Sequence, residues 1–299
     1  MIAVNHLTRR FDDTVALSDV SLQVASGSVY GLIGPNGAGK TTLIKHLTGF
    51  LPSKAGAVTV DGQPVYENIA VKERIAYISD DLFFFHSYSI RQMARFYQQT
   101  HPWFDWNRFR ELTEVFGIDP SRRASRLSKG MQKQVAFWLA LSCRPDVLIL
   151  DEPVDGLDPI MRRKVWELVM GEVADRQVTV LISSHNLREL EDVCDHVGIL
   201  HRGRMVLERE LDDMKGNVYK LQLAFSDGLP RELTEQLTVL HQSALGSLHL
   251  LIVRGKREEL SKIIAPYRPL ICDFLPLSLE EIFIYELGGI DHEIKNCIL

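Results

Sequence analysis

Short runs of β-branched and other apolar residues alternate with helical stretches along the first 215 residues of the chain. The apolar runs predict strands at Val29–Ile33, Ile75–Ser79, Val147–Leu150, Val178–Ser183 and Val197–His201. Strands that alternate with helices are typical of a mostly parallel sheet covered by helices. We therefore predict an α/β fold for this part of the chain.

The alternation is interrupted between the second and the third of these strands. Apolar spacing there predicts helices at Ile90–Gln99, Trp106–Phe116 and Ser128–Leu141, with almost no strand between them. We expect a helical subdomain over about residues 80–145. The same stretch holds ten aromatic residues between Phe83 and Phe109, a density that a helical subdomain alone does not require.

Beyond residues 215–217 the pattern changes again. Strand-like stretches at Tyr219–Phe225 and Ser247–Val253 precede a helix-like stretch at Lys256–Ile264 and an amphipathic one at Ser278–Leu287. A length of 299 residues suits one large and one small domain. We predict a larger domain at residues 1–215 and a small accessory α/β domain at residues 217–299.

Composition and charge exclude several classes of protein. With 34 Lys and Arg against 39 Asp and Glu, the net charge of −5 lacks the basic excess of a nucleic-acid binder. Apolar runs such as Val178–Ile182 are far shorter than the ~20 residues that span a bilayer, and the N-terminus has no secretory pattern. We expect a cytoplasmic chain whose cysteines are reduced structural thiols: Cys143, Cys194, Cys272 and Cys297.

A glycine-rich segment follows the first predicted strand and fits the pattern G-x-x-x-x-G-K-[ST]. Its residues are Gly34, Pro35, Asn36, Gly37, Ala38, Gly39, Lys40, Thr41 and Thr42. Such a loop curls backbone N–H groups around phosphate oxygens at a helix N-terminus. Lys40 would reach the β- and γ-phosphates and Thr41 would ligate Mg²⁺. The alternative, a chance glycine-rich turn, is disfavoured by the strand before it and the helix after it.

Two acids end the predicted strand Val147–Leu150. Asp151 and Glu152 would lie beside the phosphate loop, because ligands bind at the carboxyl ends of strands in an open α/β sheet. There Asp151 can hold the Mg²⁺ shell while Glu152 orients and deprotonates an attacking water. A strand that merely ends in solvated acids is the plainer alternative.

Further segments, in order along the chain, resemble the ATP-binding cassette (ABC) family of transporter ATPases. Leu127–Gln132 resembles its LSGGQ signature, Asp155–Asp158 its D-loop, and Ser183–His185 its switch histidine. Phe11 stands where the family has an aromatic residue that stacks on adenine. The resemblance covers roughly residues 1–215 and implies a P-loop NTPase fold with a helical subdomain.

The resemblance also implies a head-to-tail dimer with a second copy or a paralogue. Ser128 and the N–H of Gly130, together with Asp158, would then face the partner's nucleotide, and His185 would contact the γ-phosphate. Ser128 is also a good helix N-cap, which is compatible with that role. A lone histidine is more often structural, and Phe11 could equally be a packing residue; only their places in the motif series favour ATP.

Two positions depart from the family pattern. Asp80 stands where the family usually has a glutamine, and we hypothesise that it contacts Mg²⁺ or its water, since it would otherwise repel the γ-phosphate. Lys129 replaces the first glycine of the signature; it either offsets the extra acid or points to solvent.

With no span of its own, a transporter subunit needs a separate integral-membrane permease. We expect the aromatic stretch to form both the core of the helical subdomain and a docking groove, with Phe83, Phe84 and Phe85 at the groove. The signature and the C-terminal stretch resemble bacterial exporter-type ATPases, which places the chain on the inner face of the cell membrane. The rival reading is a regulatory ATP-binding dimer with little turnover.

Overall fold

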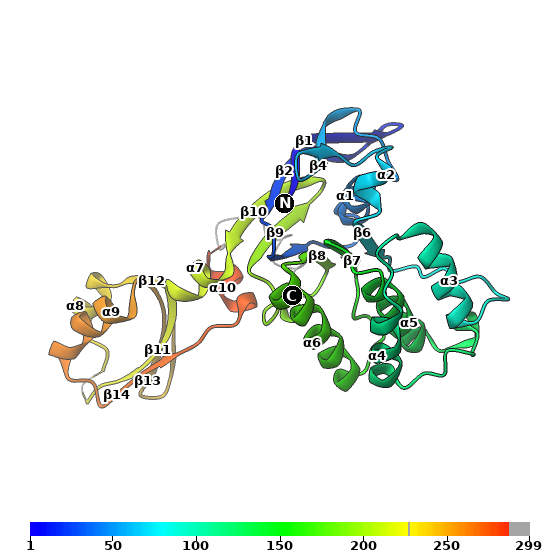
Figure 1. The fold of residues 1–299 in the computed structure, drawn as a ribbon. Coiled ribbons are helices and arrows are strands. Elements are labelled where there is room, and N and C mark those ends of the chain that lie inside the picture. The colour runs from blue at the N-terminus through cyan, green and yellow to red at the C-terminus, as the bar shows by residue number, and fades with distance from the viewer. Residues whose placement is uncertain (227, 287–299) are drawn as a thin grey trace. The chain divides into compact units, whose positions relative to one another are not determined.

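The computed structural model describes residues 1–226 and 228–286, and these divide into two compact units (Figure 1). The first unit comprises Met1–His185 and Val193–Glu208. The second comprises Asn186–Asp192 and the described residues from Arg209 onward. The short segment after His185 therefore belongs by its contacts to the second unit, although it lies between two strands of the first.

A six-stranded sheet forms the centre of the first unit, in the order β10-β9-β3-β8-β7-β6. The strands are β10 (Arg204–Glu210), β9 (His196–His201), β3 (Val29–Ile33), β8 (Thr179–Ser184), β7 (Val147–Asp151) and β6 (Ile75–Ile78). The pairs β9/β3, β3/β8, β8/β7 and β7/β6 are parallel. The predicted α/β class and the five predicted strands are confirmed, and the strands read as continuous apolar runs because both faces of the sheet are covered.

A second, antiparallel sheet has the order β2-β1-β4-β5. Its strands are β1 (Ile2–Phe11), β2 (Thr14–Val24), β4 (Ala55–Val60) and β5 (Gln63–Pro64). Helix α1 (Lys40–Leu47) contributes Leu43, Ile44 and Leu47 to a buried cluster that also contains residues of both sheets. Burial of this shared apolar core fixes the start of α1 relative to β3 and β7.

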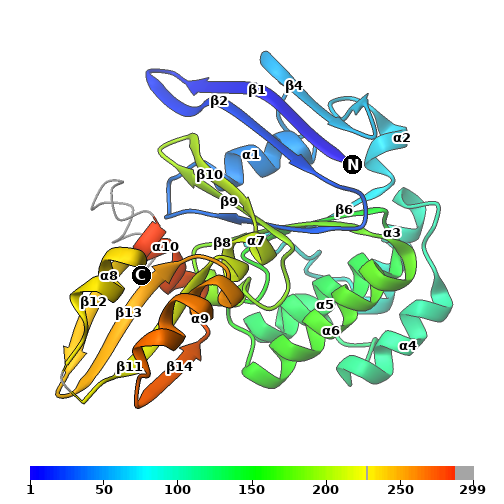
Figure 2. The same ribbon diagram turned by 90° about the vertical axis from the view of Figure 1, so that its left-hand side faces the viewer.

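The helical region contains α3 (Ile90–Thr100), α4 (Trp106–Phe116) and α5 (Lys129–Ser142), within a residue or two of the predicted bounds (Figure 2). Each helix begins at a polar cap: Ser89 with Gln92, Asp105 and Ser128. Trp138 is fully buried, stacks on Phe109 at 4.6 Å and donates from Nε1 to the Phe109 carbonyl. Much of the aromatic density is thus the core of this subdomain.

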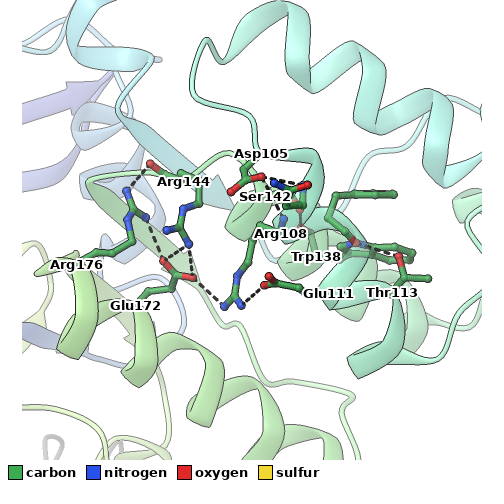
Figure 3. Close-up of polar contacts among 11 residues, drawn as sticks. Asp105, Arg108, Glu111, Thr113, Trp138, Ser142, Arg144, Glu172 and Arg176 are labelled. Atoms are coloured by element: carbon green, nitrogen blue, oxygen red, sulfur yellow. Dashed lines mark hydrogen bonds and ion pairs between the residues drawn. The ribbon is translucent and has the colours of Figure 1, made fainter.

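A buried carboxylate joins this region to α6 (Pro159–Arg176), as Figure 3 shows. The side chain of Glu172 is 4% exposed, and its oxygens lie 2.9 Å from Arg108, 3.4 Å from Arg144 and 3.0 Å from Arg176. Arg108 comes from α4, whereas Arg144 lies in the loop between α5 and β7. The Glu172 cluster, meaning these four residues, therefore links three segments of the first unit.

The second unit contains an antiparallel sheet of order β12-β13-β11-β14. Its elements are β11 (Val218–Ala224), α8 (Arg231–Gln236), β12 (Thr238–Leu245), β13 (Leu248–Arg254), α9 (Arg257–Ile264) and β14 (Ile271–Leu275). Leu233 of α8 and Leu260 and Ile264 of α9 pack on the sheet, which gives this unit its own apolar core. The predicted boundary at residues 215–217 falls at the end of α7 (Leu211–Gly216).

The last described helix of the second unit is α10 (Leu279–Glu286); residue 287 of the predicted amphipathic stretch lies outside the described residues. Helix α10 contacts a short 3-10 turn, Leu187–Glu189. Arg188 Nη2 lies 2.7 Å from Glu280, and Glu191 accepts from the backbone N–H of Leu279. The segment that follows His185 is therefore held by the C-terminal helix.

The described cysteines, Cys143, Cys194 and Cys272, are free thiols, and Cys297 lies outside the described residues. Burial raises the pKa of Cys143 and of Cys194 well above that of an ordinary thiol, so both are protonated at neutral pH. Over residues 1–226 and 228–286, no helix is both long enough and apolar enough to cross a membrane.

Candidate active site

The glycine-rich loop leads from β3 into α1. Gly39, directly before α1, has φ of 110° and Gly37 has φ of 82°, a region that favours glycine. Gly34 is required by close approach, because a Cβ there would lie 2.3 Å from the Leu200 carbonyl oxygen. The first turn of α1 therefore offers its unpaired N–H groups and the positive end of its dipole to an anion.

The other predicted loop residues complete this turn. Ala38 is buried, donates its N–H to the Pro35 carbonyl at 3.1 Å and accepts from Gly203 at 2.8 Å. Asn36 is exposed, and Thr42, in the first turn of α1, is half-buried. These contacts hold the loop to the sheet while its outer side stays open.

Lys40 and Thr41 open α1 and face two different carboxylates. Lys40 is 6% exposed, and its Nζ lies 3.2 Å from Oε1 of Glu152 and donates to the Gly34 carbonyl. Thr41 Oγ1 donates to Oδ2 of Asp151 at 3.1 Å. The cation and the hydroxyl predicted for phosphate and metal thus lie next to the two acids that end β7.

Strand pairing fixes the acids. Asp151 pairs with Ser183 across the parallel strands β7 and β8, and Ser183 Oγ donates to Oδ1 of Asp151. The N–H of Glu152 donates to the carbonyl and hydroxyl oxygens of Ser183, both at 3.2 Å. Glu152 itself has φ of 45°, a left-handed conformation uncommon for a residue other than glycine. Ser183 is a positioning group that the motif analysis did not single out.

His185 follows β8 and closes the cluster. Its Nδ1 lies 2.9 Å from Oε2 of Glu152, and its side chain is 48% exposed. Ligand atoms of Glu152, Asp155 and His185 all lie within 4.8 Å of one another. The chain after His185 forms the 3-10 turn Leu187–Glu189 and no longer helix before β9 begins at His196.

The geometry suits phosphoryl chemistry. Oε1 of Glu152 is buried beside the Lys40 ammonium, at 3.2 Å, so this oxygen becomes available to a water when the ammonium turns to a phosphate. The Thr41 hydroxyl and the Asp151 carboxylate are hard oxygen donors of the kind that Mg²⁺ takes. The donor set at this edge of the sheet therefore fits a magnesium–nucleotide complex.

Phe11 lies at the end of β1, in the tight hairpin with β2. It is 41% exposed, and the guanidinium of Arg9 lies 4.6 Å from the ring centroid on one face. The second strand of this hairpin passes the phosphate loop, because a Cβ on Gly39 would lie 2.7 Å from the Ala16 carbonyl oxygen. The Phe11 side chain is thus in contact with Arg9 and in part open to solvent.

The signature and D-loop residues meet at the starts of two helices. Ser128 caps α5 by accepting from the N–H of Met131, and Asp158 caps α6 by accepting from Ile160 and Met161. A Cβ on Gly130 would lie 2.7 Å from the Gly156 carbonyl oxygen, so glycine is needed for the two loops to pack. Both helix N-termini are exposed at Ser128 and Asp158.

Asp80 has a partner that the sequence did not indicate. The buried ammonium of Lys133, on α5, lies 3.3 Å from Oδ1 of Asp80 and donates to the Glu152 carbonyl oxygen at 2.6 Å. Lys129, which we considered as a counter-charge for the extra acid, is exposed. Lys133 stands between two glutamines near the start of α5, so the local pattern gave no signal that this ammonium is buried with a charged and a carbonyl partner.

An aromatic groove of about 400 Å³ lies between the helical region and the central sheet. The phenylalanine and tyrosine residues that line it are Phe50, Tyr77, Phe83, Phe85, Phe96 and Tyr97. Phe83 is 74% exposed, but Phe84 is 7% exposed, so the expectation that Phe84 reaches the groove is wrong. Three consecutive residues in an extended loop cannot all face one side, and Phe84 turns inward.

The chain is similar to transporter subunits over nearly its whole length. The family described as ABC transporter matches residues 17–155. The chain is 31% identical over 290 residues to the ABC transporter ATP-binding protein YtrB of Bacillus subtilis (strain 168), covering 97% of this chain and 99% of that protein. It is 29% identical to the bacitracin transport ATP-binding protein BcrA of Bacillus licheniformis, covering 97% of this chain and 98% of that protein.

Solved structures match the first unit's fold. The structure of an ATP-binding subunit of an ABC transporter covers 72% of this chain and 92% of its own, with a TM-score of 0.67 and 28% identity. The dimeric bacterial ABC transporter cassette MJ0796 covers 71% of this chain and 99% of its own, with a TM-score of 0.63 at 18% identity. The chain therefore belongs to the ATP-binding subunits of ABC transporters, a family of ATPases.

Proposed function

We propose that the chain hydrolyses ATP as one half of a head-to-tail dimer, and that this drives export through separate integral-membrane permease subunits. The observation that carries the hydrolytic part is the meeting of Lys40, Glu152 and His185 at the end of β7, where Glu152 lies 3.2 Å from the Lys40 ammonium and 2.9 Å from the His185 imidazole. Two groups from two other segments converge there on one carboxylate.

In this proposal Lys40 releases Glu152 and binds the β- and γ-phosphates when ATP enters. Glu152 then orients and deprotonates the attacking water, and His185 holds Glu152 and that water in register. The left-handed backbone and the two N–H contacts to Ser183 support this role, because they fix Glu152 before any ligand binds.

Thr41 and Asp151 would hold Mg²⁺, which supplies charge neutralisation at the phosphates when bound. Their contact at 3.1 Å supports a shared ligand position. Asp80 stays a predicted contact of the metal or its water. If it has that role, Asp80→Asn lowers the apparent affinity for Mg²⁺ measured from turnover. An unchanged affinity rejects the role.

The second half of each site would come from a partner cassette, either a copy of this chain or a paralogue. Ser128, Gly130 and Asp158 are proposed to face the partner's nucleotide, and the exposure of Ser128 and Asp158 at helix N-termini supports this. Phe11 is proposed to stack on adenine with the ring face that Arg9 leaves open. Closure of the dimer would exclude the water that weakens charge stabilisation at a single, open site.

The permease would dock in the aromatic groove. Phe83 and Phe50, at 74% and 69% exposure, are large apolar side chains left in solvent, which marks a surface for a partner. The export direction is supported by the whole-length similarity to a protein named for bacitracin transport. These assignments place the chain at the inner face of the cell membrane through its permease.

Affinity capture of the tagged chain from detergent-solubilised membranes, followed by mass spectrometry, tests the partner. We expect a hydrophobic permease with the wild-type chain, and a several-fold smaller yield with Phe83→Asp. Trp103→Asp is the matched control, because Trp103 is an aromatic residue 65% exposed outside the groove. Recovery of a soluble homodimer alone, with and without ATP, would support the regulatory reading instead.

A further inference from the structure

Lys133 is a buried cation at the junction of three functional segments. Its side chain is 5% exposed and lies on α5, five positions after the signature Ser128. Its Nζ donates to the carbonyl oxygen of Glu152 at 2.6 Å and lies 3.3 Å from Oδ1 of Asp80. Burial of an ammonium is costly unless such partners replace its water, so both contacts are needed to keep it there.

The carbonyl contact completes the anchoring of the Glu152 backbone. On one side the N–H of Glu152 is held by Ser183 of β8, at 3.2 Å to each oxygen; on the other side its carbonyl is held by Lys133. Glu152 adopts φ of 45°, and a left-handed conformation costs free energy that its surroundings must supply. Lys133 is the side chain that holds the carbonyl half of this strained peptide.

The carboxylate contact connects Lys133 to the aromatic groove. Asp80 follows β6 and precedes Phe83 and Phe85, two of the groove residues. Tyr77 lines the same groove, and burial, with the charges of Asp151 and Asp80, raises the pKa of its hydroxyl. The groove, Asp80 and the Asp151 edge are therefore neighbours in space.

We propose that Lys133 is a positioning residue that sets the backbone of Glu152 for hydrolysis, with Asp80 as the counter-ion that holds Lys133 in place. This rests on the proposed role of Glu152. It explains how an acid is tolerated after β6: Lys133 neutralises Asp80 where it would otherwise repel the γ-phosphate. A partner bound in the groove would contact the loop that carries Asp80. Through Asp80 and Lys133, this contact would act on the backbone of Glu152.

Steady-state ATP hydrolysis by the full chain tests the proposal with Lys133→Met, which keeps the length of the side chain and removes its charge. We expect kcat to fall roughly tenfold to a hundredfold, the range for losing a hydrogen bond from a charged group, with KM for MgATP within twofold. Lys164→Met is the matched control, because Lys164 also donates to a backbone carbonyl, that of Val115 on α4 at 2.7 Å. Its kcat should equal that of the wild type.

A double-mutant cycle tests the link to Asp80. At saturating Mg²⁺, where the proposed metal contact of Asp80 does not limit turnover, Asp80→Asn should lower kcat about threefold in the wild-type chain and leave kcat of Lys133→Met unchanged, because Asp80 then acts through Lys133. Asp81→Asn, which removes the neighbouring acid, should not change kcat in either background. Equal effects of Asp80→Asn in both backgrounds would overturn the counter-ion role.

The Glu152→Gln chain separates the two hypotheses. Wild-type kcat in Lys133→Met, with turnover lost in Glu152→Gln, overturns the positioning role and leaves the proposed function intact. Turnover retained in Glu152→Gln overturns the proposed role of Glu152, whatever Lys133→Met does. Should Lys133→Met not fold, judged by thermal unfolding, the kcat of Asp80→Asn against Asp81→Asn decides: equal rates reject the proposal.

Discussion

Two glutamates in the first unit are almost equally buried and yet are held in opposite ways. The Glu152 side chain is 11% exposed and faces one lysine and one histidine. The Glu172 side chain is 4% exposed and faces three arginines (Figure 3). Guanidinium groups stay charged at any physiological pH and donate several hydrogen bonds in a fixed plane, so the Glu172 cluster is permanent.

The partners of Glu152 are of a different kind. A single ammonium can exchange a carboxylate for a phosphate, and a half-exposed imidazole can rotate or exchange partners with solvent. The backbone of Glu152 is held by Ser183 and Lys133, whereas the side-chain partners of its carboxylate, Lys40 and His185, are groups that a nucleotide would engage. The comparison teaches that burial alone does not distinguish a structural carboxylate from a functional one. The two differ in whether the side chains that contact the carboxylate can leave it for a ligand.

The largest expected effect is on turnover. Glu152→Gln should lower kcat by about 10² to 10³, because the amide cannot take a proton from water, while the free energy of unfolding changes by less than about 1 kcal/mol. ATP hydrolysis and urea unfolding of the same preparation measure both quantities. A large loss of stability would show that the charge of Glu152 is structural, which would erase the distinction from Glu172.

Glu172→Gln should show the reverse. Removing this charge leaves three guanidinium groups around a neutral amide, and we expect a loss of about 3 kcal/mol in the free energy of unfolding. The kcat of the folded fraction should stay within about twofold of the wild type, because the Glu172 cluster contains none of the residues that contact Glu152. A chain of unchanged stability would contradict the structural role of the cluster.

Arg108→Met should have an intermediate effect of about 1–2 kcal/mol on the free energy of unfolding. Methionine keeps the apolar contacts of the stem, and Glu172 retains Arg144 and Arg176. The contact of α4 with Glu172 and the Arg108–Glu111 pair within α4 are lost, so hydrogen exchange should rise in α4 more than in the central sheet. Uniform exchange through the first unit would argue against a local link.

Glu167→Gln is the smallest change and the control for the series. Glu167 lies on the same helix as Glu172 and pairs with Arg163 at 3.0 Å, but the two side chains are 64% and 85% exposed. An exposed pair at this spacing is worth about 0.3 kcal/mol, and the change should disappear at high salt. A loss comparable with that of Glu172→Gln would show that helix α6, and not burial of the charge, sets the cost.

Motifs whose parts are adjacent in the chain could be predicted. The phosphate loop and the acids ending β7 follow from strand-then-turn patterns, because parallel strands bring their carboxyl ends to one edge, whereas His185 was assigned by its place in the motif series. The helices of the subdomain followed from apolar spacing, and the cap at Ser128 was recognised as well. The sequence did not predict which aromatic residues of an irregular loop point inward. Phe84, which is buried, is the example.

The sequence by itself determined the α/β class, because that class depends on backbone geometry within strand–loop–helix units, and its series of motifs determined the family. The tertiary structure alone decided that Lys133 meets Asp80, 53 positions away, and that one glutamate of α6 collects three arginines. Charge pairs between distant elements depend on how helices pack on the sheet and on the reach of long side chains. The local sequence pattern specifies neither the packing of the helices nor the reach of these side chains. The contact of Lys133 with Glu152 is therefore identified only from the tertiary structure.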